Sequence, residues 1–129
     1  MYTLTVRDHV MVAHSLPRPA FGPAQGLHGA TFVAELTVRA RELDENATVL
    51  DIGLLSGMLG EVLDGLRYRN LDEHPDFEGR LTTTEALARH IAEGVAERLA
   101  ASRGTRIVGV SVVLRENPDA WAGYSLDLP

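Results

Sequence analysis

The chain of 129 residues contains neither cysteine nor lysine. Without cysteine it can form no disulfide, no zinc–thiolate site and no thiol nucleophile. Without lysine it cannot form a Schiff base through a side-chain amine, since all 12 cationic residues are arginines. These absences leave histidine, carboxylate, hydroxyl and guanidinium groups as the available chemistry.

Long apolar runs and clustered positive charge are also missing. No apolar run approaches the roughly 20 residues of a membrane-spanning helix, and residues 1–10 are typical of a strand, not a signal peptide, because Arg7 and Asp8 interrupt them. The net charge is −6 with arginines scattered among carboxylates, so no nucleic-acid partner is expected. We therefore expect a cytoplasmic protein without membrane contact, folded as one domain over residues 1–129.

Two long stretches alternate apolar and polar residues, as half-buried strands do. The apolar face of residues 1–16 ends in His14, and that of residues 27–41 begins with His28. Prolines and glycines in residues 17–26 predict a loop without regular structure. An antiparallel hairpin would place the two histidines at the same rim of a sheet.

Two helices are expected next. Asp51 is a candidate N-cap for the first, which has apolar residues at helical spacing: Ile52, Leu55, Leu59, Val62, Leu63 and Leu66. Thr82 and Glu85 have the spacing of a capping box at the start of the second. That helix carries one apolar stripe and is expected to end near residues 102–104: Leu87, Ile91, Val95 and Leu99.

Strands over residues 106–116 and 121–128 complete an α+β chain of two strands, two helices and two strands. Glu116 is the least expected residue here, because four apolar residues precede it at period two on its own face. A buried carboxylate is costly unless it is paired, so a ligand with N–H donors is one natural partner. Alternatively, the strand frays after Leu114 and Glu116 is solvated.

The order of several short motifs resembles the 6-pyruvoyl tetrahydropterin synthase and 6-carboxytetrahydropterin synthase family, from about Thr3 to Tyr124. The motifs are Val-Ala-His14-Ser-Leu, Leu27-His28-Gly29, Val49-Leu50-Asp51, Asn70-Leu71, Thr83-Thr84-Glu85, and Glu116-Asn117-Pro118 followed by Trp121 and Tyr124. The resemblance implies a tunnelling fold (T-fold), in which each subunit supplies a four-stranded antiparallel sheet with two helices on one face. It also implies a homo-oligomer, trimer or hexamer, with small-molecule pockets between subunits.

The resemblance further assigns substrate-binding residues. A glutamate on the third strand anchors the pterin ring in the family, and Glu116 matches it. The segment Thr83, Thr84 and Glu85 matches one that lines the same pocket, although the capping box explains Glu85 equally well. His14 and Phe32 are expected in the pocket lining.

The metal site of the family is incomplete in this sequence. The family binds zinc through three histidines, and this chain keeps His14 and His28 but has Ala30 at the third position. We therefore expect no cofactor. If a metal such as zinc does bind, His14 and His28 are its ligands; otherwise they are hydrogen-bonding groups of the pocket.

The proton-transfer residues of the family are also replaced. Ala24 stands at its cysteine, and Arg67 and Tyr68 stand at its Asp-His pair, while His74 is assigned to a surface loop. Without base and metal ligand the parent reaction should not persist. Arg67 and Tyr68 are suited to orienting a carbonyl or stabilising an oxyanion, with His28 as a third catalytic group.

We therefore expect a small-molecule enzyme that catalyses a metal-independent cyclase, rearrangement or lyase step, in specialised metabolism. One alternative is a synthase-like lyase that still acts on a pterin. The other is a non-catalytic ligand-binding or scaffolding protein.

Overall fold

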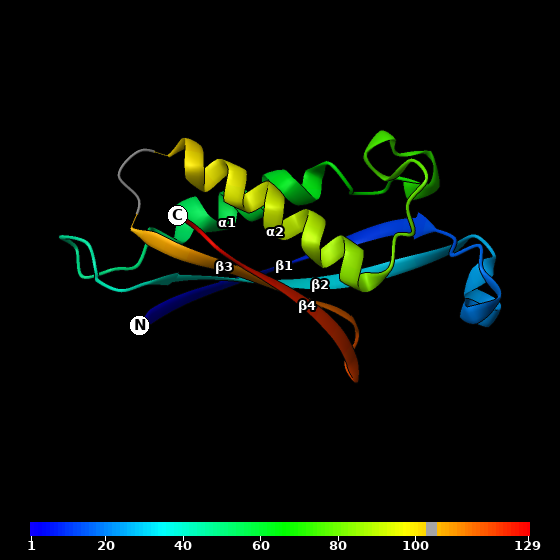
Figure 1. Cartoon of the computed structure of the whole chain (residues 1–129), viewed down its shortest axis with the longest axis horizontal. Coiled ribbons are helices and arrows are strands. Elements are labelled where there is room, and N and C mark those ends of the chain that lie inside the picture. The colour runs from blue at the N-terminus through cyan, green and yellow to red at the C-terminus, as the bar shows by residue number, and fades with distance from the viewer. Residues whose placement is uncertain (103–105) are drawn as a thin grey trace.

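The computed structural model describes residues 1–102 and 106–129 as one antiparallel sheet and two long helices. The elements are β1 (Tyr2–His14), β2 (His28–Ala40), α1 (Ile52–Asp64), α2 (Thr84–Ala101), β3 (Ile107–Asn117) and β4 (Ala120–Asp127). The strands lie in the order β1-β2-β3-β4, and both helices cover the same face of the sheet (Figure 1). The expected order of two strands, two helices and two strands is confirmed.

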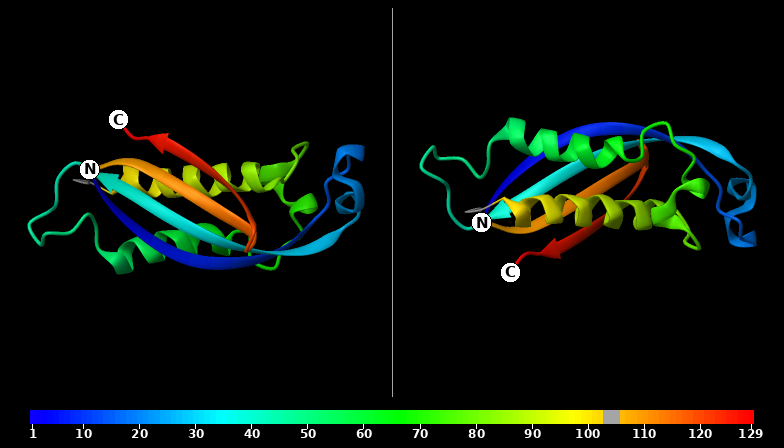
Figure 2. Two further views of the ribbon diagram at one scale, coloured as in Figure 1. Left: turned by 90° about the horizontal axis from the view of Figure 1, so that it is seen from below. Right: turned by 90° about the horizontal axis from the view of Figure 1, so that it is seen from above.

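The core lies between the helices and the covered face of the sheet; Figure 2 shows the molecule from the sheet side on the left and from the helix side on the right. Alternate residues of the strands and one stripe of each helix are buried there, including Val10, Phe32, Leu36, Leu55, Leu59, Leu63, Leu87, Ile91, Leu99, Val112 and Leu114. The alternation and the helical spacing therefore predicted this interface. One expectation was wrong, because Ile52 at the start of α1 is 62% exposed. In the described residues no helix is both long and apolar enough to cross a membrane.

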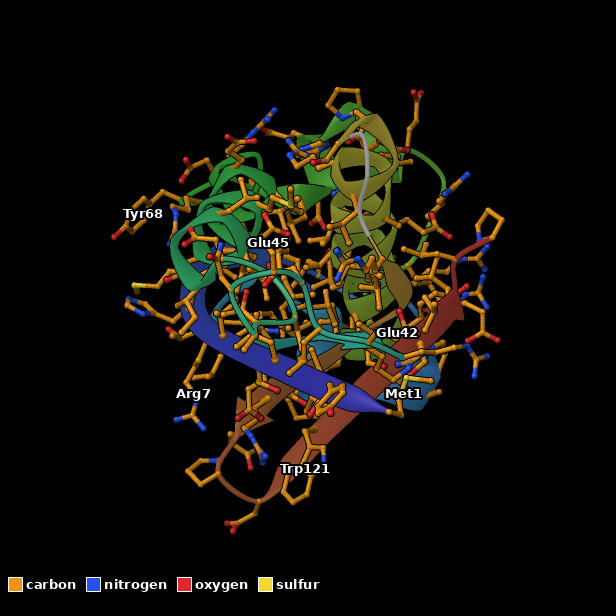
Figure 3. The ribbon with its side chains drawn as sticks, turned by 90° about the vertical axis from the view of Figure 1, so that its left-hand side faces the viewer. Met1, Arg7, Glu42, Glu45, Tyr68 and Trp121 are labelled. Carbon is orange, nitrogen blue, oxygen red and sulfur yellow. The ribbon has the colours of Figure 1, made fainter. Side chains whose placement is uncertain are left out.

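The uncovered face of the sheet carries a charged row that crosses all four strands. The Glu35 carboxylate accepts hydrogen bonds from Arg7 and Arg115, each at 2.7 Å, and the two guanidinium groups hold the pKa of Glu35 below its usual range. The Arg115 guanidinium lies 4.3 Å from the ring centroid of Trp121. Arg7 and Trp121 project from the same side of the sheet (Figure 3).

Arg39 ties β2 to the two strands beyond it. Its guanidinium donates to the Ser111 hydroxyl at 2.6 Å and to the Asp127 carboxylate at 3.3 Å. It reaches them by lying flat over Gly109, where an added Cβ would overlap the guanidinium group. Gly109 is therefore required for this close approach.

The connections contain more regular structure than the sequence indicated. The prediction of a loop without regular structure over residues 17–26 was wrong, because Pro19–Gln25, labelled η1, forms 3₁₀ turns on either side of a kink at Gly22, whose φ is 52°. Two further 3₁₀ turns, η2 (Leu71–Glu73) and η3 (Pro75–Phe77), follow α1. His74 lies between them and is buried, not at the surface, with its Nε2 3.0 Å from the Gly65 carbonyl.

The segment that follows α1 runs along the outer edge of β1. Tyr68 N–H donates to the Met11 carbonyl at 2.7 Å, and Ala13 N–H donates to the Arg69 carbonyl at 3.0 Å. Ala13 and Asn70 form a parallel bridge. This segment therefore covers the edge of β1 near its C-terminal end.

Two glycine substitutions should act in opposite directions. Gly109→Ala should lower the free energy of unfolding by about 1–3 kcal/mol, since Arg39 must leave its partners on β3 and β4. Gly57→Ala should raise it by up to about 1 kcal/mol, because Gly57 lies inside α1 with no atom within 4 Å of the added Cβ. Urea unfolding of both variants checks this, and a Gly109→Ala protein as stable as the wild type would contradict it.

Candidate functional site

His14 and His28 lie together at one end of the sheet. They are opposite residues in the antiparallel pairing of β1 with β2, and their ring centroids are 4.6 Å apart. The prediction that they share a rim is confirmed. Phe32 packs beside them, its ring centroid 6.2 Å from that of His14 in an edge-to-face arrangement.

His14 is buried and fixed by the segment that precedes α2. Its Nδ1 lies 3.0 Å from the Thr82 carbonyl oxygen and 2.9 Å from the Thr82 hydroxyl. Donation from Nδ1–H to the carbonyl leaves a lone pair on Nε2. Burial lowers the pKa of His14, and the neighbouring His28 lowers it further, so this imidazole is neutral at pH 7.

His28 is held in the same manner by the loop before β2. Its Nδ1 lies 2.9 Å from the Gly26 carbonyl oxygen, so donation from Nδ1–H again leaves Nε2 as the acceptor. A backbone carbonyl that fixes one ring nitrogen sets the tautomer and orientation of the imidazole. The pair therefore offers two oriented nitrogen lone pairs at the rim of the sheet.

The donor set does not fit a three-ligand zinc centre. Catalytic zinc sites usually take three protein ligands and leave a fourth position open. Within residues 1–102 and 106–129 no three or more histidine, cysteine, aspartate or glutamate side chains are grouped so that they could hold a metal ion. Ala30 stands two residues after His28, on the same face of β2.

The start of α2 differs from the predicted capping box. The N-cap is Thr83, whose hydroxyl accepts from Ala86 N–H at 3.2 Å. Thr82 cannot cap the helix because it is buried against His14, and Glu85 is exposed in the first turn. Sequence reasoning missed Thr82 as the partner of His14, since a run of three threonines gives no signal for which one turns inward.

Glu116 is exposed, so of the two interpretations of this carboxylate the solvated one holds in the single chain, although β3 does not fray after Leu114 and continues to Asn117. The register of β3 with β4 shifts between Arg115 and Asn117, and such a bulge interrupts the alternation of faces. The carboxylate nevertheless acts on His14, because its negative charge raises the pKa of that imidazole, as does the charge of Asp72. Glu116 therefore belongs to the same end of the molecule.

Arg67 lies outside this cluster within one chain and is occupied by structural contacts. Its guanidinium donates to Asp64 and Asp8 at 2.8 Å each and to the His9 carbonyl at 2.6 Å. These contacts fasten the end of α1 to the middle of β1. They leave Arg67 a clamp between elements.

Tyr68 points away from the protein. Its side chain is 83% exposed and projects into solvent (Figure 3). Its backbone has a φ of 57°, a left-handed conformation that a bulky residue adopts only when its surroundings impose it. Here Tyr68 N–H donates to the Met11 carbonyl and the Arg67 guanidinium donates to the His9 carbonyl, so both bonds hold this segment against the same edge of β1.

The fold is similar to that of solved pterin synthases. The 6-pyruvoyl tetrahydropterin synthase of Caenorhabditis elegans has a TM-score of 0.78 at 24% identity, over 95% of this chain and 94% of that one. The enzyme of the same name from Plasmodium vivax has a TM-score of 0.81 at 16% identity, over 98% of both chains. The fold is therefore the T-fold of these synthases.

The sequence matches a family model over almost its whole length. The family model of 6-pyruvoyl tetrahydropterin synthase matches residues 3–127, and the chain belongs to this family. It is also 28% identical to the 6-carboxy-5,6,7,8-tetrahydropterin synthase of Bacillus subtilis over 120 residues, which are 90% of this chain and 80% of that relative.

The lowered pKa of His14 should make stability depend on pH. The unfolded chain takes up a proton near pH 6.5 and the folded chain only at lower pH, so the free energy of unfolding should be fully present above about 6.5 and fall below it. His14→Gln should remove part of this slope in urea unfolding between pH 5 and 8. His90→Gln should remove another part, because burial also lowers the pKa of His90. An unchanged slope in His14→Gln would contradict the assignment.

Proposed function

We propose that this protein is a small-molecule enzyme on the pterin-synthase scaffold, carrying out a metal-independent lyase- or cyclase-type step with the His14–His28 pair at its centre. The observation that carries the proposal is the pair itself. Both imidazoles have Nδ1 against a backbone carbonyl, which fixes Nε2 as a base without a metal. The absence of a third ligand among the described residues supports the same conclusion.

The roles in the site follow from burial and exposure. His28 is only half-buried, so its Nε2 is the accessible base, and His14 is the inner, buried group of the pair. General-base catalysis of this kind typically contributes 10²–10⁴-fold in rate. Phe32 and Ala30 give the rim an apolar lining, and Thr83 and Thr84 at the start of α2 supply hydroxyl groups for a bound substrate.

Tyr68 takes part, in this proposal, from a neighbouring subunit. The Tyr68 backbone is left-handed and its side chain is 83% exposed. The phenol is therefore available to a site on a second copy of the chain. The edge strands β1 and β4 offer the positions at which copies can pair. We infer a homo-oligomer, trimer or hexamer, whose sites are completed across subunit contacts.

The proposal is tested with pterins carrying a side chain at C6, incubated with protein stripped by a chelator. Mass spectrometry should detect a product. The rate at which it forms should be the same before and after chelator treatment, and it should fall at least about 100-fold in His28→Ala. Tyr68→Phe should lower the rate by about tenfold or more. Turnover that the chelator abolishes and zinc restores would overturn the metal-independent mechanism.

The second candidate is a lyase that still recognises the pterin ring. The match to a 6-carboxy-5,6,7,8-tetrahydropterin synthase and the location of Glu116 near the histidine pair favour it. In both candidates the Glu116 carboxylate accepts from ring N–H groups of the ligand.

Glu116→Gln should therefore weaken binding of a reduced pterin by about tenfold or more, because a charged hydrogen-bond acceptor is lost. The quenching of Trp121, the one tryptophan of the chain, measures binding. Glu97→Gln, an exposed carboxylate near the C-terminal end of α2, is the matched control. Equal weakening in both variants would remove Glu116 from the site, and tight binding without any turnover would favour a ligand-binding protein over an enzyme.

A further inference from the structure

His74 is a buried histidine that the proposed reaction does not use. It lies between η2 and η3 and is 6% exposed, and each of its ring nitrogens has a backbone partner. Nδ1 accepts from Asp76 N–H at 3.1 Å, so this nitrogen carries no proton. Nε2–H donates to the Gly65 carbonyl at 3.0 Å. The two bonds together require a neutral imidazole with its proton on Nε2.

The bond at Nδ1 makes the turn sensitive to a second proton on the ring. His74 is the N-cap of η3, because its side chain accepts from Asp76 N–H. A proton added to Nδ1 takes the lone pair that this N–H uses, so the capping bond breaks. Neutral and charged His74 therefore cannot share one conformation of η3.

Charged groups lie next to His74 along the segment that follows α1. The Arg69 guanidinium donates to the same Gly65 carbonyl at 3.3 Å, so a charged imidazole would stand beside another cation. Glu73, just before His74 in sequence, is exposed to solvent. An Asp76 carboxylate oxygen lies 3.9 Å from Nδ1. Asp76 therefore offers a backbone N–H that binds the neutral ring and a carboxylate that can bind the charged one.

The face of His74 packs against two further rings. The Phe77 ring centroid lies 5.1 Å from that of His74 and 4.8 Å from that of His90 on α2, and the two imidazole centroids are 6.5 Å apart. Burial lowers the pKa of His90, and His74 lowers it further, while Asp76, Glu93 and Glu97 act in the opposite direction. His90 is therefore the second group of this cluster whose protonation must be followed.

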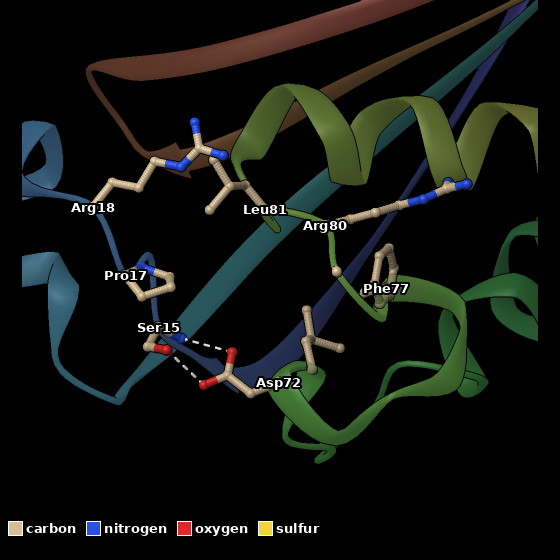
Figure 4. A pocket seen from close by; sticks show the side chains of 9 residues that line it. Ser15, Pro17, Arg18, Asp72, Phe77, Arg80 and Leu81 are labelled. Carbon is tan, nitrogen blue, oxygen red and sulfur yellow. Dashed lines mark hydrogen bonds between the residues drawn. The ribbon is translucent and has the colours of Figure 1, made fainter.

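The turn is connected to the histidine pair by the chain that follows it. Phe77 N–H donates to the His74 carbonyl at 3.1 Å, and Arg80 N–H donates to the Phe77 carbonyl at 2.9 Å. Two residues further on, Thr82 is buried and fixes the His14 imidazole. Figure 4 shows Phe77 and Arg80 on the opposite side of a pocket from the loop after β1. A change in η3 therefore reaches the residue that orients His14 within a few positions.

We propose that His74 is a pH-sensitive switch that sets the conformation of residues 74–82. The neutral imidazole caps η3 by accepting from Asp76 N–H, and the charged imidazole donates from Nδ1–H to the Asp76 carboxylate instead. The two arrangements exclude each other because they use the same ring nitrogen. Acidification replaces the first by the second and loosens the contact between Thr82 and His14. The inference holds whatever reaction the histidine pair catalyses.

The test follows imidazole nitrogen and backbone amide NMR signals of the isotope-labelled chain between about pH 8 and 5. The amide signals of Asp76, Phe77 and Thr82 should shift with the same midpoint as the His74 nitrogens. His74→Asn does not titrate but keeps an oxygen that can cap η3, so this common transition should be lost. Asp76→Asn keeps the N–H and removes the carboxylate, so the transition should move to lower pH.

His90→Gln is the matched control, since it removes the other titratable ring of the cluster and should leave the transition at Asp76 in place. A transition that persists in His74→Asn, or that disappears in His90→Gln, would overturn the proposal by assigning the change to another group. A His74 ring that keeps a single proton until the whole chain unfolds would also overturn it. Shifts at Asp76 without any at Thr82 would confine the change to η3 and contradict the coupling to His14.

Discussion

The hydrogen bond between His14 and Thr82 is the interaction on which the arrangement of the site depends. It joins the last residue of β1 to the residue before the N-cap of α2, and both partners are buried. A buried imidazole without a partner would cost about 1–3 kcal/mol, so the two segments must stay together for the fold to keep its stability. The same bond fixes the tautomer of His14, and through the pairing of β1 with β2 it locates His28.

A second constraint is the set of contacts that Arg67 makes in the segment after α1. Arg67 and Tyr68 are neighbours in sequence but differ in their contacts. The Arg67 guanidinium donates to two carboxylates and a carbonyl, whereas the Tyr68 side chain is 83% exposed. The three hydrogen bonds of the Arg67 guanidinium hold the backbone immediately before Tyr68. They therefore help to offset the cost of the left-handed conformation of Tyr68. Arg67 therefore holds the segment that carries Tyr68, and the expectation that both residues act in catalysis stays a prediction.

The sequence predicted the features that repeat along the chain. Alternation in the strands and helical spacing in α1 and α2 follow from burial of one face, and the adjacency of His14 and His28 follows from their places at the ends of two such faces. Features that depend on contacts between distant residues were not predictable in this way. Thr82 contacts His14 and the helix cap falls one residue later, Glu116 is exposed at a register shift between β3 and β4, and the partners of Arg67 lie on two other elements.

The segment over residues 67–70 also limits how β1 can associate. An edge strand that is open along its whole length can accept another strand in several registers and can propagate into fibrils. Here Met11 and Ala13 are already paired, so an incoming strand can extend only along the N-terminal half before it meets the segment. The segment is therefore a steric stop, and it restricts both the register of assembly and the length of edge that is open to aggregation while the chain is still a monomer.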